Sequence, residues 1–225
     1  MYRAGLIVAA LVLATPAAAA DLPAGPVAPV PAGYVPYQNY NWSSVYIGGN
    51  AGYGFATASV TDNFFPFFTS SENLNGFIGG GQIGANYQIG ALVFGIEGDF
   101  DASNQSKTTT VGIVTETDKI NWIGTVRGRV GAAYDRWFFY GTAGGGEGKF
   151  SANLSSPFGS LNVSQTHAVW AAGAGLEVGI NDYLTARIEY LYFATGDMSS
   201  FGGFPITVNV QDNVIRGGLN LRLPY

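Results

Sequence analysis

The amino-acid sequence predicts an all-β fold, an eight-stranded antiparallel up-and-down transmembrane β-barrel. Three observations support this fold class: a C-terminal strand with one apolar and one charged face, an N-terminal export signal, and eight alternating segments joined by alternately short and long connections. This combination is typical of outer-membrane barrels, in which short periplasmic turns alternate with longer external loops.

The last segment, residues 213–225, has the clearest alternation. Successive side chains of a strand point to opposite faces of the sheet. One face carries Ile215, Leu219, Leu221, Leu223 and the terminal Tyr225, and the other carries Arg216, Asn220 and Arg222. An apolar face toward lipid and a charged face toward a lumen fit the wall of a membrane barrel.

The first twenty residues form an export signal. Arg3 gives a short positive region, Leu6 to Leu13 is apolar, and small residues follow Pro16. Cleavage is expected after Ala19 or after Ala20, both of which leave small residues at the recognition positions. The apolar run is shorter than the ~18 residues of a spanning helix, so we expect removal rather than anchoring.

The predicted domain organisation has two parts after the signal at 1–20. Residues 21–41 are rich in proline, which forbids a helix and favours an extended periplasmic linker. Residues 42–225 form the barrel domain.

The composition excludes several classes of protein. The chain has no cysteine, so neither a disulfide framework nor thiol chemistry is expected. Without the signal it carries nine basic and fifteen acidic residues, and no basic run, which argues against a nucleic-acid partner. A soluble β-sandwich would also alternate, but it would not require aromatic residues at both ends of its strands.

Eight alternating segments are long enough for tilted transmembrane strands of ~9–11 residues. They are residues 45–55, 77–87, 92–100, 120–134, 137–147, 169–180, 184–193 and 213–225. Short turns are expected at 88–91, 135–136 and 181–182, and long polar loops at 56–76, 101–118, 150–167 and 194–211. In the fourth segment Ile120 and Trp122 are assigned to the lipid face, and in the fifth the run Trp-Phe-Phe-Tyr leaves the faces ambiguous.

Aromatic residues gather at the two ends of the predicted strands. The short-turn end has Tyr87, Tyr134, Trp137, Tyr183 and Tyr225, and the long-loop end has Phe55, Phe77, Phe100, Trp122, Trp170 and Phe193. Two such belts match the two interfaces of a membrane.

Nine charged residues fall on the inward faces of the predicted strands. They are Glu97, Asp99, Arg127, Arg129, Glu177, Arg187, Glu189, Arg216 and Arg222. At eight strands the interior is only wide enough for side chains to fill it. Because an unpaired buried charge is costly, we expect a salt-bridge network that blocks the lumen; the alternative is the selectivity lining of a narrow pore.

Motifs that suggest chemistry lie in the wrong context. Residues 79–84 match G-x-G-x-x-G but sit inside a predicted strand, and residues 144–149 lack the first glycine and the final Ser or Thr of a phosphate loop. His167, the only histidine, is placed in a loop and is a weak candidate for a haem ligand. No catalytic constellation, metal site or resident cofactor is expected, and the chain is not expected to be an enzyme.

Segments 44–54, 76–87, 125–131 and 213–220 together resemble the small outer-membrane β-barrel family of alphaproteobacteria, as does the signal ending Ala-Ala-Asp-Leu-Pro at 19–23. The resemblance implies insertion by the outer-membrane assembly machinery, roles in envelope integrity, surface antigenicity and host interaction, and haem binding in some relatives. It also implies an assembly signal formed by Leu219, Leu221, Leu223 and Tyr225, from which Pro224 departs.

A mature chain that starts at Ala20 would be similar to family members that are linked to peptidoglycan. The flexible linker would then let the N-terminus reach the cell wall.

The function expected from these features is that of a structural protein of the outer membrane. It would contact outer-membrane lipids and lipopolysaccharide, and expose the aromatic clusters of loops 56–76 and 194–211 for host or ligand contact. The alternative is a narrow porin-like channel or a haem-binding surface protein.

Overall fold

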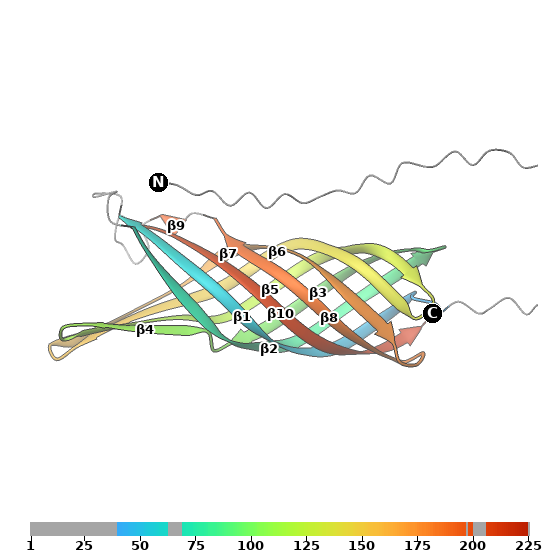
Figure 1. The fold of residues 1–225 in the computed structure, drawn as a ribbon, viewed down its shortest axis with the longest axis horizontal. Coiled ribbons are helices and arrows are strands. Elements are labelled where there is room, and N and C mark those ends of the chain that lie inside the picture. The colour runs from blue at the N-terminus through green and yellow to red at the C-terminus, as the bar shows by residue number, and fades with distance from the viewer. Residues whose placement is uncertain (1–39, 63–68, 197, 200–205, 225) are drawn as a thin grey trace, which may run out of the picture. The chain divides into compact units, whose positions relative to one another are not determined.

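A computed structural model describes residues 40–62, 69–196, 198–199 and 206–224 of the chain. Eight strands in this part form a closed antiparallel ring, in which β1 pairs with both β2 and β10 (Figure 1). They are β1 (Ser44–Asp62), β2 (Thr69–Ile89), β3 (Leu92–Ser103), β5 (Val114–Tyr134), β6 (Trp137–Ser156), β7 (Gly159–Gly179), β8 (Leu184–Thr195) and β10 (Ile206–Pro224). The predicted fold class, an up-and-down barrel, is confirmed.

Two shorter strands extend the ring at one end. β4 (Ser106–Val111) forms a hairpin with β5, and β9 (Met198–Ser199) pairs with β10. No helix in the described part of the chain is long and apolar enough to cross a membrane.

The short turns lie where the sequence predicts them. β2 passes to β3 through Gly90, whose φ is 62°, and β5 passes to β6 through Asp135, whose φ is 51°. Glycine adopts positive φ without strain, and Asp tolerates it better than most residues, which is what a tight hairpin requires. At the same end Ser44 of β1 lies opposite Pro224 of β10.

The predicted long loops are largely wrong, because the strands continue through them. β6 and β7 stay paired as far as Ser156 and Gly159, and β4 and β5 form a hairpin within the expected loop 101–118. Figure 1 shows the green β4–β5 and the yellow-to-orange β6–β7 hairpins projecting beyond the barrel. Within loops 56–76 and 194–211, residues 63–68, 197 and 200–205 lie outside the described part.

The strand extensions carry hydroxyl side chains, so apolar alternation in the sequence does not predict them. Pairs of Ser or Thr hydroxyls face each other across neighbouring strands at 3.0–3.2 Å: Thr108 and Thr117, Thr110 and Thr115, Ser151 and Ser164. Cross-strand Thr and Ser pairs stabilise a sheet that has water on its face. The strand pattern is present there, but it is polar.

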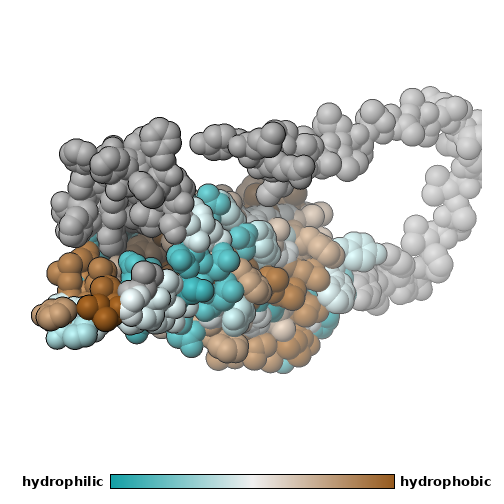
Figure 2. Space-filling model, turned by 60° about the vertical axis from the view of Figure 1, so that its left-hand side comes forward, coloured by the Kyte–Doolittle hydropathy of each residue, from teal (hydrophilic) through white to brown (hydrophobic). Residues whose placement is uncertain are grey.

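The outer wall of the barrel is apolar, as predicted. Ile47, Phe77 and Trp170 are each more than 60% exposed on it. Leu219, Leu221 and Leu223 of the expected assembly signal also point outward, whereas Tyr225 lies outside the described residues. Figure 2 shows hydrophilic surface between this apolar wall and a smaller hydrophobic group at the end that comes forward.

Three predicted faces need correction or completion. A β-bulge between Ile120 and Trp122 reverses the alternation, so Ile120 is buried inside the barrel. Phe193 is also buried inside and does not belong to the outer aromatic belt. In β6 the ambiguous run resolves with Phe138 and Tyr140 inside.

Candidate functional site

A network of buried charges occupies the middle of the lumen. Its members project inward from β3, β5, β7, β8 and β10, and each is at least nine-tenths buried. They are Glu97, Asp99, Asp101, Glu177, Glu189, Arg127, Arg129, Arg187 and Arg216. We refer to these five carboxylates and four guanidinium groups as the charge network.

Glu97 lies at the centre of the charge network. Its carboxylate accepts hydrogen bonds from Arg127 at 2.7 Å, Arg129 at 3.3 Å and the hydroxyl of Tyr46 at 2.8 Å. Arg187 donates a further bond to the same group. One carboxylate therefore holds arginines from β5 and β8, strands that do not pair with each other.

Arg216 of β10 ties the other carboxylates together. Its guanidinium lies 2.9 Å from Asp99, 2.6 Å from Asp101 and 2.8 Å from Glu189. Strand register brings several partners together directly, since Glu189 lies opposite Arg216 between β8 and β10. Charge-assisted hydrogen bonds from a planar guanidinium suit such convergent carboxylates.

The structure brings eight of the nine predicted inward charges into the charge network. Asp101 joins them although the sequence places it in a loop; it continues the parity of Glu97 and Asp99, so a longer β3 would have included it. Arg222 lies apart, at the short-turn end, where its guanidinium sits 4.6 Å from the ring of Tyr40.

An apolar layer fills the lumen on the long-hairpin side of the charge network. All its members are buried and lie on the inward faces of seven of the ring strands. They are Ala56, Leu74, Ile78, Ile120, Ile123, Phe150, Val169, Ala171, Leu191, Phe193, Val210 and Val214. The same level also holds a buried polar pair, in which the side-chain amide of Gln105 donates to the carboxylate of Asp212 at 3.0 Å, so the layer is mainly but not wholly apolar.

An aromatic cap closes the short-turn side. It consists of Tyr40, Trp42, Phe138 and Tyr140, packed with Val93. The ring of Trp42 lies 5.0 Å from Tyr40 and 5.2 Å from Phe138, and Trp42 is completely buried. Tyr40 belongs to the predicted linker 21–41, yet it packs as part of the barrel.

The aromatic cap is tied to all three short turns. Trp42 donates its indole N–H to the carbonyl of Asp135 at 3.0 Å and its backbone N–H to the side chain of Gln88 at 2.7 Å. The hydroxyl of Tyr40 donates to the carbonyl of Asn181 at 2.9 Å. Arg222 donates to the carbonyl of Asn41 at 2.7 Å, so the last strand also holds this segment.

An acidic patch lies on the hairpins beyond the apolar wall. The pKa of Asp118 is raised to about 6, mainly by burial and also by the nearby carboxylates of Glu116 and Glu72. Lys107 lies 4.0 Å from Glu72. Among the described residues no three His, Cys, Asp or Glu side chains are placed to hold a metal ion.

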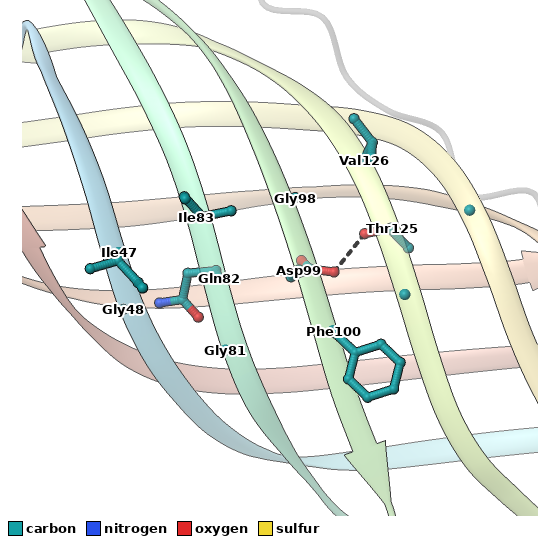
Figure 3. Close-up of a pocket in the computed structure, with 12 residues that line it drawn as sticks. Ile47, Gly48, Gly81, Gln82, Ile83, Gly98, Asp99, Phe100, Thr125 and Val126 are labelled. Carbon is teal, nitrogen blue, oxygen red and sulfur yellow. Dashed lines mark hydrogen bonds between the residues drawn. The ribbon is translucent and has the colours of Figure 1, made fainter.

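A hollow of about 580 Å³ lies in the outer wall across β1, β2, β3 and β5 and reaches Gly146 of β6 (Figure 3). Exposed side chains of Ile47, Ile83, Phe100 and Val126 surround it, and glycines leave the backbone bare between them. Beneath it, the hydroxyl of Thr125 donates to Asp99 at 2.7 Å. The hollow is therefore part of the apolar outer surface.

His167 lies in strand β7, opposite Gly148, and not in a loop as predicted. Its Nε2 is 3.1 Å from the side-chain oxygen of Gln165. The glycine motifs at 79–84 and 144–149 also lie within strands, β2 and β6. A Cβ added to Gly80 would come within 1.9 Å of the Phe100 carbonyl, which explains this glycine by close packing of strands.

The expected cleavage residues Ala19 and Ala20 lie outside the described residues.

Similarity to known proteins adds to what the geometry indicates. The family model for the outer membrane protein beta-barrel domain matches residues 6–222. A 31 kDa outer-membrane immunogenic protein of Brucella melitensis is 34% identical over 234 residues, which cover 95% of this chain and 96% of the relative.

Two further similarities are to a curated relative and to a solved structure. A 22 kDa outer membrane protein of Rhizobium leguminosarum bv. viciae is 34% identical over 68% of this chain and 64% of its own length. The outer membrane protease OmpT of Escherichia coli covers 80% of this chain and 97% of its own with a TM-score of 0.51; at 7% identity this likeness concerns the fold alone. The chain belongs to the outer membrane protein β-barrel domain family and is a protein of the bacterial outer membrane.

Proposed function

We propose that this barrel is a closed structural element that supports the integrity of the outer membrane and presents its external hairpins for contact. The observation that carries the proposal is the filling of the lumen. The aromatic cap, the charge network and the apolar layer follow one another along the barrel, and each consists of buried side chains. Eight-stranded barrels are just narrow enough for such filling.

The charge network supports a structural role for the inward charges. Its arginines and carboxylates lie within hydrogen-bonding distance of one another, so these groups form ion pairs with each other. A selectivity lining would instead face a path for solutes. The narrow porin-like channel is the alternative that a conductance measurement separates from our proposal.

The external hairpins support a role in contact with partners outside the cell. Ile113 lies at the turn between β4 and β5, and Phe158 at the turn between β6 and β7; both are exposed. The Brucella relatives are named immunogenic proteins. By similarity we propose that these hairpins form an antigenic surface of this protein too.

The remaining partners follow from the location. We propose contacts of the outer wall with outer-membrane lipids and lipopolysaccharide, assembly by the outer-membrane machinery through β10, and attachment of the mature N-terminus to peptidoglycan. Tyr40 in the aromatic cap would then hold the described end of this segment in the barrel mouth. Sacculi that are free of this protein after muramidase release would contradict the last of these contacts.

The test is conductance of the refolded protein in a planar bilayer, with heat-modifiable gel mobility as the criterion of folding. We expect a heat-modifiable band and no stepwise conductance, with an open porin in the same bilayer as the positive control. Stable conductance steps with ion selectivity would overturn the closed lumen and make the narrow channel the leading function.

A further inference from the structure

The outer part of β7 has a strand neighbour on one side only. β6 pairs with β7 along its whole length, from Gly159 to Val178. β8 pairs with β7 only from Val169 onward, because beyond Thr195 the chain follows β10 through β9. Among the described residues, no strand pairs with the other side of residues 160–166, which we call the open edge.

The register identifies which backbone groups face the open edge. The N–H of Gly179 donates to the carbonyl of Arg136 at 2.8 Å, so odd-numbered residues of β7 point their backbone groups toward the β6 side. The pairing of β6 with β7 continues without a register shift. The N–H and C=O groups of Ser160, Asn162 and Ser164 therefore point away from β6, along the open edge.

In the described part of the chain, the open edge lacks the features that usually protect a sheet edge. Such features are a charged side chain, a proline, a bulge or a covering segment. Residues 160–166 contain no Lys, Arg, Asp, Glu or Pro. The opposite edge of the same hairpin sheet, β4, carries Lys107 next to Glu72 and touches β2 through Ser106 and Asn75.

The side chains beside the open edge alternate in chemistry. Leu161 and Val163 lie on one face, opposite Leu154 and Ala152 of β6. Ser160, Asn162 and Ser164 lie on the other face and are exposed. A strand added here would place apolar side chains beside Leu161 and hydroxyl side chains beside Asn162, since same-face neighbours in a sheet pair by chemistry.

We propose that the open edge binds an extended, uncharged peptide segment of an external protein by β-strand addition. The segment would alternate apolar and hydroxyl side chains and would bond to the backbone of Ser160, Asn162 and Ser164. This proposal rests on the proposed role of the external hairpins in contact. It names the class of partner and the mode of binding.

A second copy of this chain in the same membrane does not fit the open edge in antiparallel pairing. All copies insert in one direction, so their β7 strands run the same way across the membrane. Antiparallel pairing of two β7 edges requires opposite directions. Only a copy in a facing membrane would meet this requirement, and the test below includes that outcome.

The first experiment measures binding of a labelled, end-blocked heptapeptide, Thr-Val-Thr-Val-Thr-Val-Thr, to the full protein in nanodiscs by fluorescence anisotropy. We expect saturable binding that is lost when the peptide is N-methylated at alternate residues. The double variant Asn162→Pro/Ser164→Pro removes two edge N–H groups without touching the pairing with β6. It should bind about 10- to 100-fold more weakly, because two main-chain hydrogen bonds are lost.

Two controls keep the result interpretable. Asn162→Ala/Ser164→Ala changes the side chains but keeps the N–H groups, so its affinity should stay within about threefold of the unchanged protein. Asn162→Lys/Ser164→Lys keeps both the fold and the N–H groups but adds charge, and should weaken binding as natural edge lysines do. Equal binding by the unchanged, proline and lysine proteins would overturn the proposal, as would a lack of saturable binding.

Hydrogen exchange tests what covers the open edge: the added peptide, this chain itself or a second copy. We expect the amides of Ser160, Asn162 and Ser164 to exchange fast in the unliganded protein and to be protected by the peptide. Protection without peptide would overturn the proposal, because the edge would already be covered by this chain. If the protein links two nanodiscs and the proline variant does not, the occupant of the open edge is a copy of this chain in a facing membrane, and the external peptide is ruled out. Conductance is independent of these readouts, so the closed lumen and the open edge can fail separately.

Discussion

Replacing Arg216 by methionine tests whether the charge network holds the barrel together. Arg216 is 2% exposed and contacts Asp99, Asp101 and Glu189 within 2.9 Å. Methionine has a similar length and no charge. The substitution therefore removes the cation that three buried carboxylates share, although Arg127 still contacts Asp99 and Glu189, and it changes the packing volume little.

The expected loss is about 3–5 kcal/mol in the free energy of unfolding, which is typical when one partner of a buried ion pair is removed. Asp101 is the carboxylate most affected, because Arg216 is the one cation within 4.0 Å of it among the described residues. Adding Asp101→Asn to the methionine variant should therefore recover about 1–3 kcal/mol, since one uncompensated buried charge is removed.

The assay is denaturant unfolding in lipid vesicles, followed by tryptophan fluorescence and heat-modifiable mobility. Arg136→Met, in an exposed turn, is the matched control and should cost less than about 1 kcal/mol. An Arg216→Met protein as stable as this control would refute the reasoning, as would a double variant that is less stable than the single one.

Three further predictions follow from other parts of the chain. Trp42→Ala should lower the free energy of unfolding by about 3–5 kcal/mol and speed exchange of the amides in the three short turns, because it empties the aromatic cap; unchanged exchange would contradict the cap. Gly80→Ala should prevent folding into vesicles, since its Cβ would meet a carbonyl at 1.9 Å, while Gly81→Ala, whose Cβ would lie 3.6 Å from its nearest neighbour, should fold normally; equal yields of the two variants would show that the close approach is unimportant. Asp118 has a pKa raised to about 6 in the folded protein from 3.8, so its proton stabilises the hairpin below pH 3.8 and this contribution is lost as the pH rises through 6. Hydrogen exchange of β4 and β5, corrected for intrinsic rates, should therefore be slower at pH 5 than at pH 7, and Asp118→Asn should reduce the difference.

The ring of strands was predictable because lipid imposes the same requirement on every strand. Each outward position must be apolar, so Ile47, Phe77 and Leu219 mark the wall without knowledge of any contact. The inward charges were predictable for the complementary reason. They share the parity opposite to the wall, and a narrow lumen forces them together.

Features that do not face lipid could not be predicted from apolar alternation in the sequence. Beyond the membrane both faces of a strand meet water, so Thr108 and Ser164 carry no apolar alternation and were assigned to loops. The bulge after Ile120 inserts one residue, which reverses every face on one side of it and leaves no mark in composition. Tyr40 and Trp42 follow a proline-rich stretch, and only the tertiary fold places them in the barrel mouth.

Different parts of the same strand contribute to the filled lumen and to the open edge. β7 contributes Glu177 to the charge network, Val169 to the apolar layer and Asn162 to the open edge. Substitutions at Glu177 should change stability in any membrane, because its partners are buried. Proline at Asn162 should weaken binding and leave stability nearly unchanged, because the N–H group that it removes bonds to no other described strand. Because three layers at different heights close the lumen, no single substitution in one of them is expected to open it; a variant that conducts after one change would show that the layers are not independent barriers.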